Sequence, residues 1–159
     1  MRIYLACTVR GDRGAVGAAR RIAAHLQAAG HEVLTSHLLD DDVDSKEGSL
    51  SSEAVFERDL RWLESCDLLV AEASGSSYGV GFEVGYILGR GATTGQRVLL
   101  VYDRAREGAI SRLISGNTHP ACTVLGYESV QQIGAFLAKH LPASRRQDAE
   151  SSVAPVTRN

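Results

Sequence analysis

Long apolar runs and an excess of charge of either sign are both missing from this 159-residue sequence. A membrane-spanning helix needs about 20 consecutive apolar residues, and no stretch comes near that length. The formal net charge of -2 argues against a general binder of nucleic acid or of membrane surfaces, which is usually basic. The first residues, MRIYLACTVRG, follow a strand pattern and not the layout of a signal peptide. We therefore expect a cytoplasmic protein with no nucleic-acid or membrane partner.

Cysteine is also scarce, and its three copies, Cys7, Cys66 and Cys122, lie far apart in or beside apolar runs. No pair has the spacing of a zinc site, and the five histidines show no HxxxH spacing. We expect the cysteines to be small buried hydrophobic residues in a reducing compartment. The acidic run DDDVD, residues 40–44, indicates a solvated loop rather than a metal site, because an acidic run alone seldom marks one.

What the sequence does contain is an alternation of apolar strand patterns and amphipathic helix patterns. The predicted strands are 3–9, 31–37, 66–73, 97–103 and 122–127. The predicted helices are 14–29, 51–64, 79–91, 108–116 and 128–140, with a polar loop over 38–50. This order predicts the α/β class: one three-layer, flavodoxin- or Rossmann-like domain over residues 1–141, with a five-stranded parallel sheet and helices on both faces. Residues 142–159 are polar and unpatterned, and we expect them to be a disordered tail.

The first strand-to-helix loop lies where ligands of such sheets bind, at the carboxyl ends of the strands. This loop, TVRGDRG over residues 8–14, has a hydroxyl, an arginine, and glycines that expose backbone N–H groups at a helix start. The combination suits phosphate, although neither GxxxxGK[ST] nor GxGxxG is present. Taken alone, the loop fits a glycine-rich turn with a surface arginine better than a phosphate site.

A second candidate loop is SSYGVGFEVGYILGRG, residues 76–91, which follows the third strand and opens a helix. Its glycine spacing is GxGxxxG, whereas a dinucleotide fingerprint has GxGxxG. Glu83 does not suit a phosphate cradle, because like charges repel. Two roles fit Glu83 equally well. It is either a carboxylate nucleophile that the positive end of a helix keeps ionised, or a capping glutamate of the first turn.

Two further features of the helices have open interpretations. Gly81, Gly85 and Gly89 leave a bare stripe, which indicates close packing against another helix or a second subunit, or the approach of a ligand or the sheet. Asp59, in FERDLRWLE, is either a second carboxylate near the site or a solvated charge. The pattern alone favours the solvated charge.

Five blocks in chain order resemble the 2'-deoxynucleoside 5'-phosphate N-hydrolases of the nucleoside 2-deoxyribosyltransferase superfamily. The blocks are IYLACTVRG, TSHL, ERDLRWLESCDLLVAE, SYGVGFEVGY and ISRLISG, and they extend over roughly residues 2–127. The resemblance implies a homodimer with a five-stranded parallel sheet. It also implies cleavage of the N-glycosidic bond of deoxynucleoside monophosphates to a free base and 2-deoxyribose 5-phosphate, with no metal or organic cofactor.

The resemblance assigns roles to individual residues. Glu83 would be the nucleophile, Asp59 would contact the sugar and assist catalysis, and Tyr4 would lie near the reacting centre. The other expected contacts are Thr8, Arg10, Gly11 and Ser77 with the 5'-phosphate, Gly79 with the sugar, His37 with the base, and Ser111 with the phosphate in the other subunit's site.

Two positions depart from the family pattern. Thr8 replaces a common serine and keeps the hydroxyl, whereas Phe82 replaces a common tyrosine and loses it. Residues 38–50 do not align, so base preference is open. Two other activities also stay open, a ribonucleoside 5'-monophosphate (CMP-type) N-glycosidase and a nucleoside deoxyribosyltransferase, although Arg10 argues against the latter by implying a phosphate requirement. A nucleotide sensor without turnover is the alternative outside enzymes.

Overall fold

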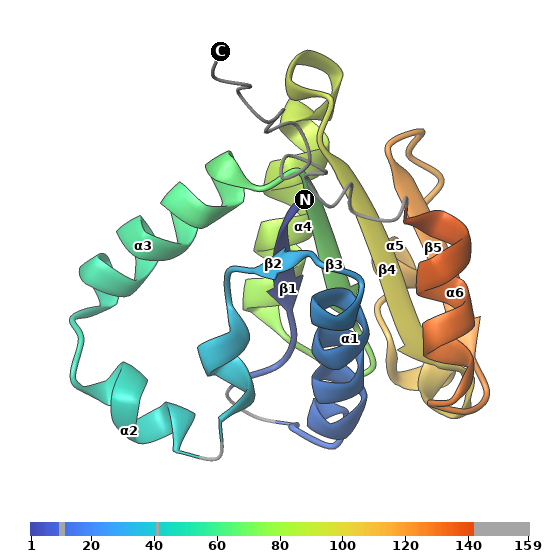
Figure 1. Cartoon of the computed structure of the whole chain (residues 1–159), viewed down its shortest axis with the longest axis horizontal. Helices are drawn as coiled ribbons and strands as arrows, with labels where there is room; N and C mark the ends of the chain where they lie inside the picture. The colour runs from blue at the N-terminus through green and yellow to red at the C-terminus, as the bar shows by residue number, and fades with distance from the viewer. Residues whose placement is uncertain (10–11, 41, 142–159) are drawn as a thin grey trace, which may run out of the picture.

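A computed structural model describes residues 1–9, 12–40 and 42–141 of the chain (Figure 1). Within them, one five-stranded parallel sheet has the order β2-β1-β3-β4-β5. Its strands are β1 (Arg2–Ala6), β2 (Glu32–Val33), β3 (Leu68–Glu72), β4 (Arg97–Asp103) and β5 (Cys122–Tyr127). The helices are α1 (Val16–Ala28), α2 (Val43–Gly48), α3 (Ser52–Ser65), α4 (Tyr78–Thr94), α5 (Arg112–Ser115) and α6 (Gln132–His140), with 3-10 segments η1 (Ser36–Leu39) and η2 (Arg104–Ala109). The predicted fold class is confirmed.

Helices cover both faces of the sheet, and each face has its own apolar core (Figure 1). On one face, α1 and α6 pack on the strands through Ala18, Ile22, Leu26, Ile133 and Leu137. On the other face, α3 and α4 pack through Leu63, Val80, Val84 and Ile87. Because successive side chains of a strand point to opposite faces, Ile3 and Leu5 join the first core and Tyr4 joins the second. This alternation places Tyr4 beneath α4.

The strand order reverses at β1, which pairs with β2 on one side and with β3 on the other. The chain therefore leaves β1 toward α1 on one face and leaves β3 toward α4 on the other. Such a switch point leaves a crevice outside the carboxyl ends of the two strands, where ligands of open parallel sheets bind. The loop after β1 and the start of α4 flank this crevice.

Serine side chains fix the starts of the two helices beside the crevice. Oγ of Ser51 accepts a 3.1 Å hydrogen bond from the backbone N–H of Ala54 at the start of α3. Oγ of Ser77 accepts a 3.3 Å bond from the N–H of Val80 at the start of α4. Each bond satisfies one of the N–H groups that a helix start leaves without an intrahelical partner.

Some elements differ from their predicted extents. β2 has two residues, and η1 includes the end of the strand predicted over 31–37. The segment 38–50, predicted to be a loop, contains α2, and the helix predicted over 108–116 is divided between η2 and α5. These pieces are too short for apolar periodicity to mark them. The expected tail from residue 142 lies outside the described residues. None of the described helices has the length and apolar character needed to cross a membrane.

The loops after β1 and β3 touch at Gly75. A Cβ atom at this position would lie 2.5 Å from Oγ1 of Thr8 and 2.7 Å from the backbone oxygen of Asp12. Both distances are well inside van der Waals contact, and neither neighbour is the end of a long flexible side chain. The close approach of the two loops therefore requires glycine here.

We predict that Gly75→Ala lowers the free energy of unfolding by about 1–3 kcal/mol, because the added methyl group overpacks the contact between the loops. Urea unfolding measures the change. Gly17→Ala on α1 is the matched control, since a Cβ there meets nothing within 4 Å. Helix propensity predicts that this control gains up to about 1 kcal/mol. A Gly75→Ala protein as stable as wild type would contradict the tight contact.

Candidate active site

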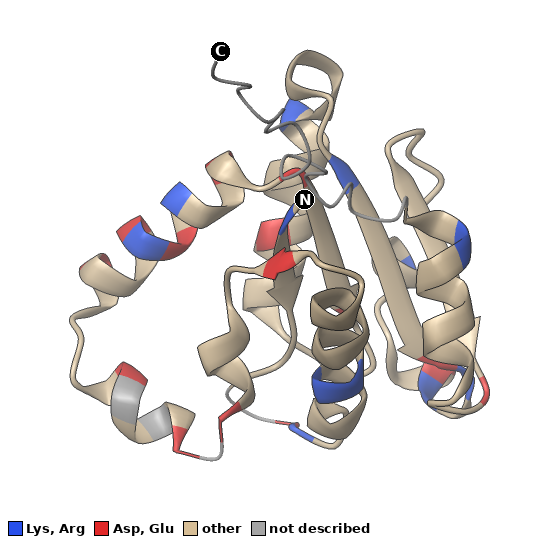
Figure 2. Ribbon diagram, viewed as in Figure 1, with Lys and Arg blue, Asp and Glu red and all other residues tan. Residues whose placement is uncertain are grey.

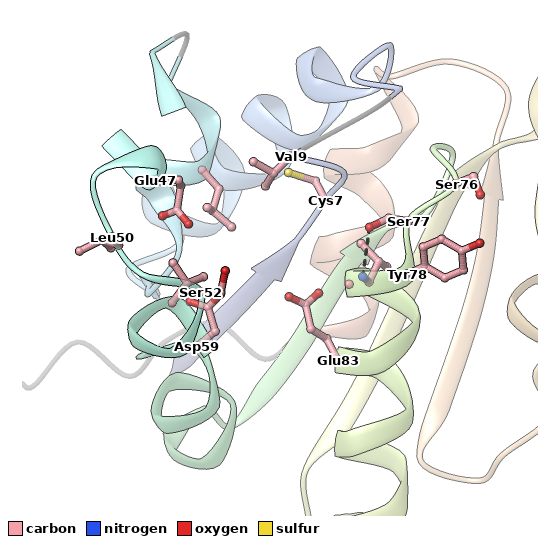
Figure 3. A pocket seen from close by; sticks show the side chains of 14 residues that line it. Cys7, Val9, Glu47, Leu50, Ser52, Asp59, Ser76, Ser77, Tyr78 and Glu83 are labelled. Atoms are coloured by element: carbon pink, nitrogen blue, oxygen red, sulfur yellow. Dashed lines mark hydrogen bonds between the residues drawn. The ribbon is translucent and has the colours of Figure 1, made fainter. Parts of the chain in front are cut away.

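A cavity of about 550 Å³ opens beside the carboxyl ends of β1 and β3 (Figure 3). Residues of η1, α2 and α3 form one side of it, and the start of α4 forms the other. The loop after β1 lies between the two sides. The lining residues are Cys7, Val9, Leu38, Glu47, Leu50, Ser52, Val55, Asp59, Ser76, Ser77, Tyr78, Gly79, Val80 and Glu83. The structure thus brings the two predicted carboxylates, Asp59 and Glu83, into one cavity.

The Glu83 carboxylate is held by Tyr4. The hydroxyl of Tyr4, which is fully buried on β1, donates a 2.7 Å hydrogen bond to Oε1 of Glu83. Burial raises the pKa of Glu83 to about 7, the Tyr4 hydrogen bond opposes the rise, and the charge of Asp59 adds to it. Burial also raises the pKa of Tyr4, so the hydroxyl keeps its proton and remains a donor. Glu83 is therefore oriented, and its pKa lies near neutral pH.

The electrostatic setting of Glu83 differs from the expected one. Helix α4 begins at Tyr78, so Glu83 lies in the second turn, and no acidic residue occupies the first. The field of a helix terminus declines within the first turn, and burial is the largest cause of the shift in the pKa of Glu83. The capping alternative is also wrong, because Ser77 caps the helix.

Asp59 is not the solvated charge that its pattern favoured. It lines the cavity from α3, opposite Glu83 (Figure 3). Burial raises its pKa, although Arg58 opposes the rise. Nε of Arg58 donates a 2.9 Å hydrogen bond to Oδ1 of Asp59. Acidic and basic residues are interspersed along α3 (Figure 2), and Asp59 is the charged residue of this helix that lines the cavity.

Arg58 also binds Glu47 of α2, which lines the same cavity. Nη1 lies 2.7 Å from Oε1 of Glu47, and Nη2 lies 3.2 Å from Oε2. These bonds hold the pKa of Glu47 below its usual range. The guanidinium also lies over the ring of Trp62, 4.9 Å from its centroid. One cation therefore joins α2 to α3 and fixes two carboxylates of the cavity wall.

His37 lies behind this wall and does not itself line the cavity. Its ring packs against Trp62, with the two centroids 5.3 Å apart. Its Nε2 lies 3.3 Å from Oε1 of Glu47, outside the geometry of a hydrogen bond. Any influence of His37 on a bound base would therefore act through Glu47.

The other predicted substrate contacts do not all line the cavity. Ser77, predicted to bind the phosphate, and Gly79, predicted to contact the sugar, line its other end at the start of α4. Thr8 is buried, and its Oγ1 has no hydrogen-bond partner among the described residues. Since buried polar groups are nearly always satisfied, this hydroxyl is a group that a ligand or water would satisfy. Arg10 and Gly11 lie outside the described residues.

Ser111 is in a different place from the other predicted residues. It precedes α5 and borders a second hollow of about 530 Å³, next to α4. The start of α4 separates the two hollows, and Ser76, Ser77, Tyr78 and Val80 line both of them. Within one chain, Ser111 and Glu83 do not share a cavity.

Sequence reasoning missed three residues of the site: Glu47, Arg58 and Cys7. Glu47 fell in a segment interpreted as a solvated loop, and its partner Arg58 is eleven positions away on another helix. No local pattern shows that α2 folds back on α3. Burial raises the pKa of Cys7 to about 11, so it lines the cavity as a thiol. Within the described residues, no three His, Cys, Asp or Glu side chains form a metal-binding group.

Comparisons with known proteins identify the family to which the chain belongs. The family model described as nucleoside 2-deoxyribosyltransferase matches residues 3–120. A Thermofilum pendens protein with the provisional name 2'-deoxynucleoside 5'-phosphate N-hydrolase 1 is 40% identical, over 91% of this chain and 97% of its own. A Danio rerio 5-hydroxymethyl-dUMP N-hydrolase is 34% identical, over 73% of this chain and 78% of its own. The solved structure of the Clostridium botulinum CMP N-glycosidase BcmB has the same fold, with a TM-score of 0.63 and 19% identity over 89% of this chain and 100% of its own. The chain belongs to the nucleoside 2-deoxyribosyltransferase family.

Proposed function

We propose that this protein hydrolyses the N-glycosidic bond of 2'-deoxynucleoside 5'-monophosphates, giving a free base and 2-deoxyribose 5-phosphate. The observation that carries the proposal is the half-buried Glu83 carboxylate, held by Tyr4 in a cavity that ends at the start of a helix. The names of the Thermofilum pendens and Danio rerio relatives support the same class of substrate.

Glu83 is the proposed nucleophile. Its free oxygen attacks C1' of the sugar as the bond from C1' to the base nitrogen breaks, and that electron pair leaves with the base. The transition state resembles an oxocarbenium ion, which a nearby carboxylate stabilises. The absence of a 2'-hydroxyl makes this cation easier to form. Water then hydrolyses the glycosyl ester, which restores Glu83 and retains the configuration at C1'.

Asp59 has two candidate tasks in this reaction. It faces Glu83 across the cavity, and Arg58 fixes its orientation. It either accepts a hydrogen bond from a sugar hydroxyl or delivers a proton to the departing base. Burial raises the pKa of Asp59. A general acid must hold a proton, so Asp59 is better suited to the second task than an exposed aspartate would be.

The 5'-phosphate is expected at the start of α4. Ser77 and Gly79 line the cavity there, and the first N–H groups of a helix attract anions. The unpartnered Oγ1 of Thr8 is a further donor. Phosphate contacts lie away from the bond that breaks, so their binding energy orients the sugar against Glu83.

A second copy of the chain is the proposed occupant of the other hollow. Gly81 and Gly85 of α4 line it, and a Cβ on either meets nothing within 4 Å in this chain. Tyr78 and Leu113 also line it, and both are almost fully exposed. Apolar surface of this kind marks interfaces. Ser111 borders this hollow, so a homodimer would bring it toward the partner's phosphate site.

Release of free base tests the proposed reaction. We expect release from deoxynucleoside monophosphates, and we expect Glu83→Ala to lower the rate by roughly 10³-fold or more, because the nucleophile is lost. Chromatography of reactions with deoxynucleotides, ribonucleotides and unphosphorylated deoxynucleosides measures it. Glu53→Ala, exposed on α3, is the control and keeps the wild-type rate.

Each other result of this assay assigns a different function. Equal cleavage of ribonucleotides would make the protein a ribonucleoside monophosphate N-glycosidase. A new nucleotide formed from an added acceptor base would make it a deoxyribosyltransferase. No base release from any substrate would overturn hydrolysis and favour a nucleotide sensor.

The pH dependence of kcat/KM should follow Glu83. The reaction needs the carboxylate, so kcat/KM is expected to fall as pH decreases through about 7, the pKa that burial gives this group. Tyr4→Phe removes a hydrogen bond that stabilises the charged form, so the midpoint should move to higher pH. The substrate phosphate also titrates near pH 6, but it does so equally with the wild-type protein and with Tyr4→Phe, so it does not affect the difference between their midpoints. Tyr86→Phe, on the outer part of α4, is the control. A midpoint unchanged or lowered by Tyr4→Phe would contradict the role of this bond.

Mixing two impaired variants tests whether each active site is built from both subunits of the proposed dimer. Glu83→Ala and Ser111→Ala are each expected to be impaired at substrate concentrations below KM. If Ser111 serves the partner's site, each mixed dimer contains one site with both native residues. Random assortment in a 1:1 mixture then restores about a quarter of the wild-type sites. A mixture no more active than the mean of its components would contradict the exchange.

A further inference from the structure

The two ends of the cavity have different chemistry. Ser76 and Ser77 lie on one side of Glu83, and Glu47 and Leu50 lie on the other (Figure 3). An anionic phosphate is repelled by Glu47 and Asp59, so it takes the serine end. With C1' of the sugar at Glu83, the base must extend toward Glu47. We call this region, lined by Val9, Leu38, Glu47, Leu50, Ser52 and Val55, the base end.

The base end offers apolar surfaces for the faces of a ring and few polar groups for its edge. Val9, Leu38, Leu50 and Val55 are aliphatic. The hydroxyl of Ser52 either donates or accepts, so it does not discriminate between bases. Among the described residues that line this end, Glu47 is the charged one, with a side chain only 11% exposed. The identity of a bound base is therefore read mainly by this carboxylate.

Arg58 determines the state in which Glu47 meets a base. Its two bonds to Oε1 and Oε2 keep the carboxylate ionised and fixed in place. An ionised carboxylate only accepts hydrogen bonds, and each oxygen can accept more than one. Glu47 therefore retains acceptor capacity toward the cavity while Arg58 holds it.

We propose that Glu47 makes the enzyme selective for bases that carry an exocyclic amino group, as cytosine and adenine do, over their oxo counterparts, uracil and hypoxanthine. The inference rests on the proposed function and specifies its substrate. An amino group donates a hydrogen bond to the fixed carboxylate. A carbonyl oxygen in the same place faces the carboxylate with no proton between the two oxygens, so the two negative ends repel and the carbonyl oxygen is left without a hydrogen bond.

The ring N–H of an oxo base does not remove this penalty. In uracil, N3–H lies between two carbonyl groups, and in hypoxanthine, N1–H lies beside one. Turning that N–H toward Glu47 brings a carbonyl oxygen close to the carboxylate. Sites built to bond a donor discriminate strongly against ligands that lack it, because the buried partner is left unpaired.

Two matched substrate pairs test the proposal, dCMP against dUMP and dAMP against dIMP. Within each pair, one amino group is exchanged for an oxo group on the same ring. We expect kcat/KM of the wild-type protein to favour the amino member by about tenfold or more in at least one pair. Ratios near one, or in favour of the oxo member, in both pairs would overturn the inference while leaving the hydrolase in place. No cleavage of any deoxynucleotide would instead contradict the proposed function.

Glu47→Gln assigns the selectivity to its source. An amide can donate as well as accept, so the variant should bring the ratio close to one or reverse it, with turnover of the oxo substrate retained or raised. Glu53→Gln, at an exposed position of α3, removes a charge outside the cavity and should keep the wild-type ratio of kcat/KM values. A purely structural role for Glu47 would lower both members equally. An unchanged ratio in Glu47→Gln would therefore overturn the assignment, and thermal unfolding confirms that both variants are folded.

Discussion

The proposed reaction depends on shielding a carboxylate partly from water beside the sheet. Glu83 is half-buried above Tyr4, whose ring is part of the core beneath α4 and whose hydroxyl donates to Oε1. Burial makes the ionised form costly and raises the pKa to about 7. The same burial removes the water that would weaken the attraction between the carboxylate and a cationic transition state. The position of Tyr4 follows from strand alternation and from β1 lying next to β3.

On the opposite wall of the cavity, Arg58 stabilises two further carboxylates in their ionised form. These carboxylates, Glu47 and Asp59, line the cavity, and without a counter-charge their desolvation would be unfavourable. The single guanidinium bonds to both and lies over Trp62. Its planar fork suits this task, since a lysine could not make the same set of fixed bonds. The bridge also joins α2 to α3, so the shape of the base end and its charge have a common origin.

The sequence predicted the class of the fold and much of its layout because α1, β3 and β4 are long enough for periodicity to mark them. It failed for β2, α2 and α5, which have two, six and four residues and exist because of tertiary contacts. In the site, the resemblance identified Glu83 and Asp59, whereas the local pattern placed Asp59 in solvent. Glu47 and Arg58 were missed because their pairing requires two helices to fold against each other. The raised pKa of Glu83 was also missed, because burial is a property of the assembled layers.

The charge balance of the cavity would give the proposed second subunit a role in catalysis. The described residues that line it include three carboxylates and no lysine or arginine, while the proposed substrate brings about two more negative charges on its phosphate. Glu83 can tolerate this only if the phosphate is held apart from it and neutralised by donors, which in the proposed site would be the first N–H groups of α4 and the hydroxyls of Ser77 and Thr8. Each added donor at the phosphate end therefore favours the ionised form of Glu83. Since the start of α4 lines both hollows, a partner bound in the second hollow would contribute its serine where such donors are needed. On this argument, dimerisation would complete the active site in addition to covering apolar surface.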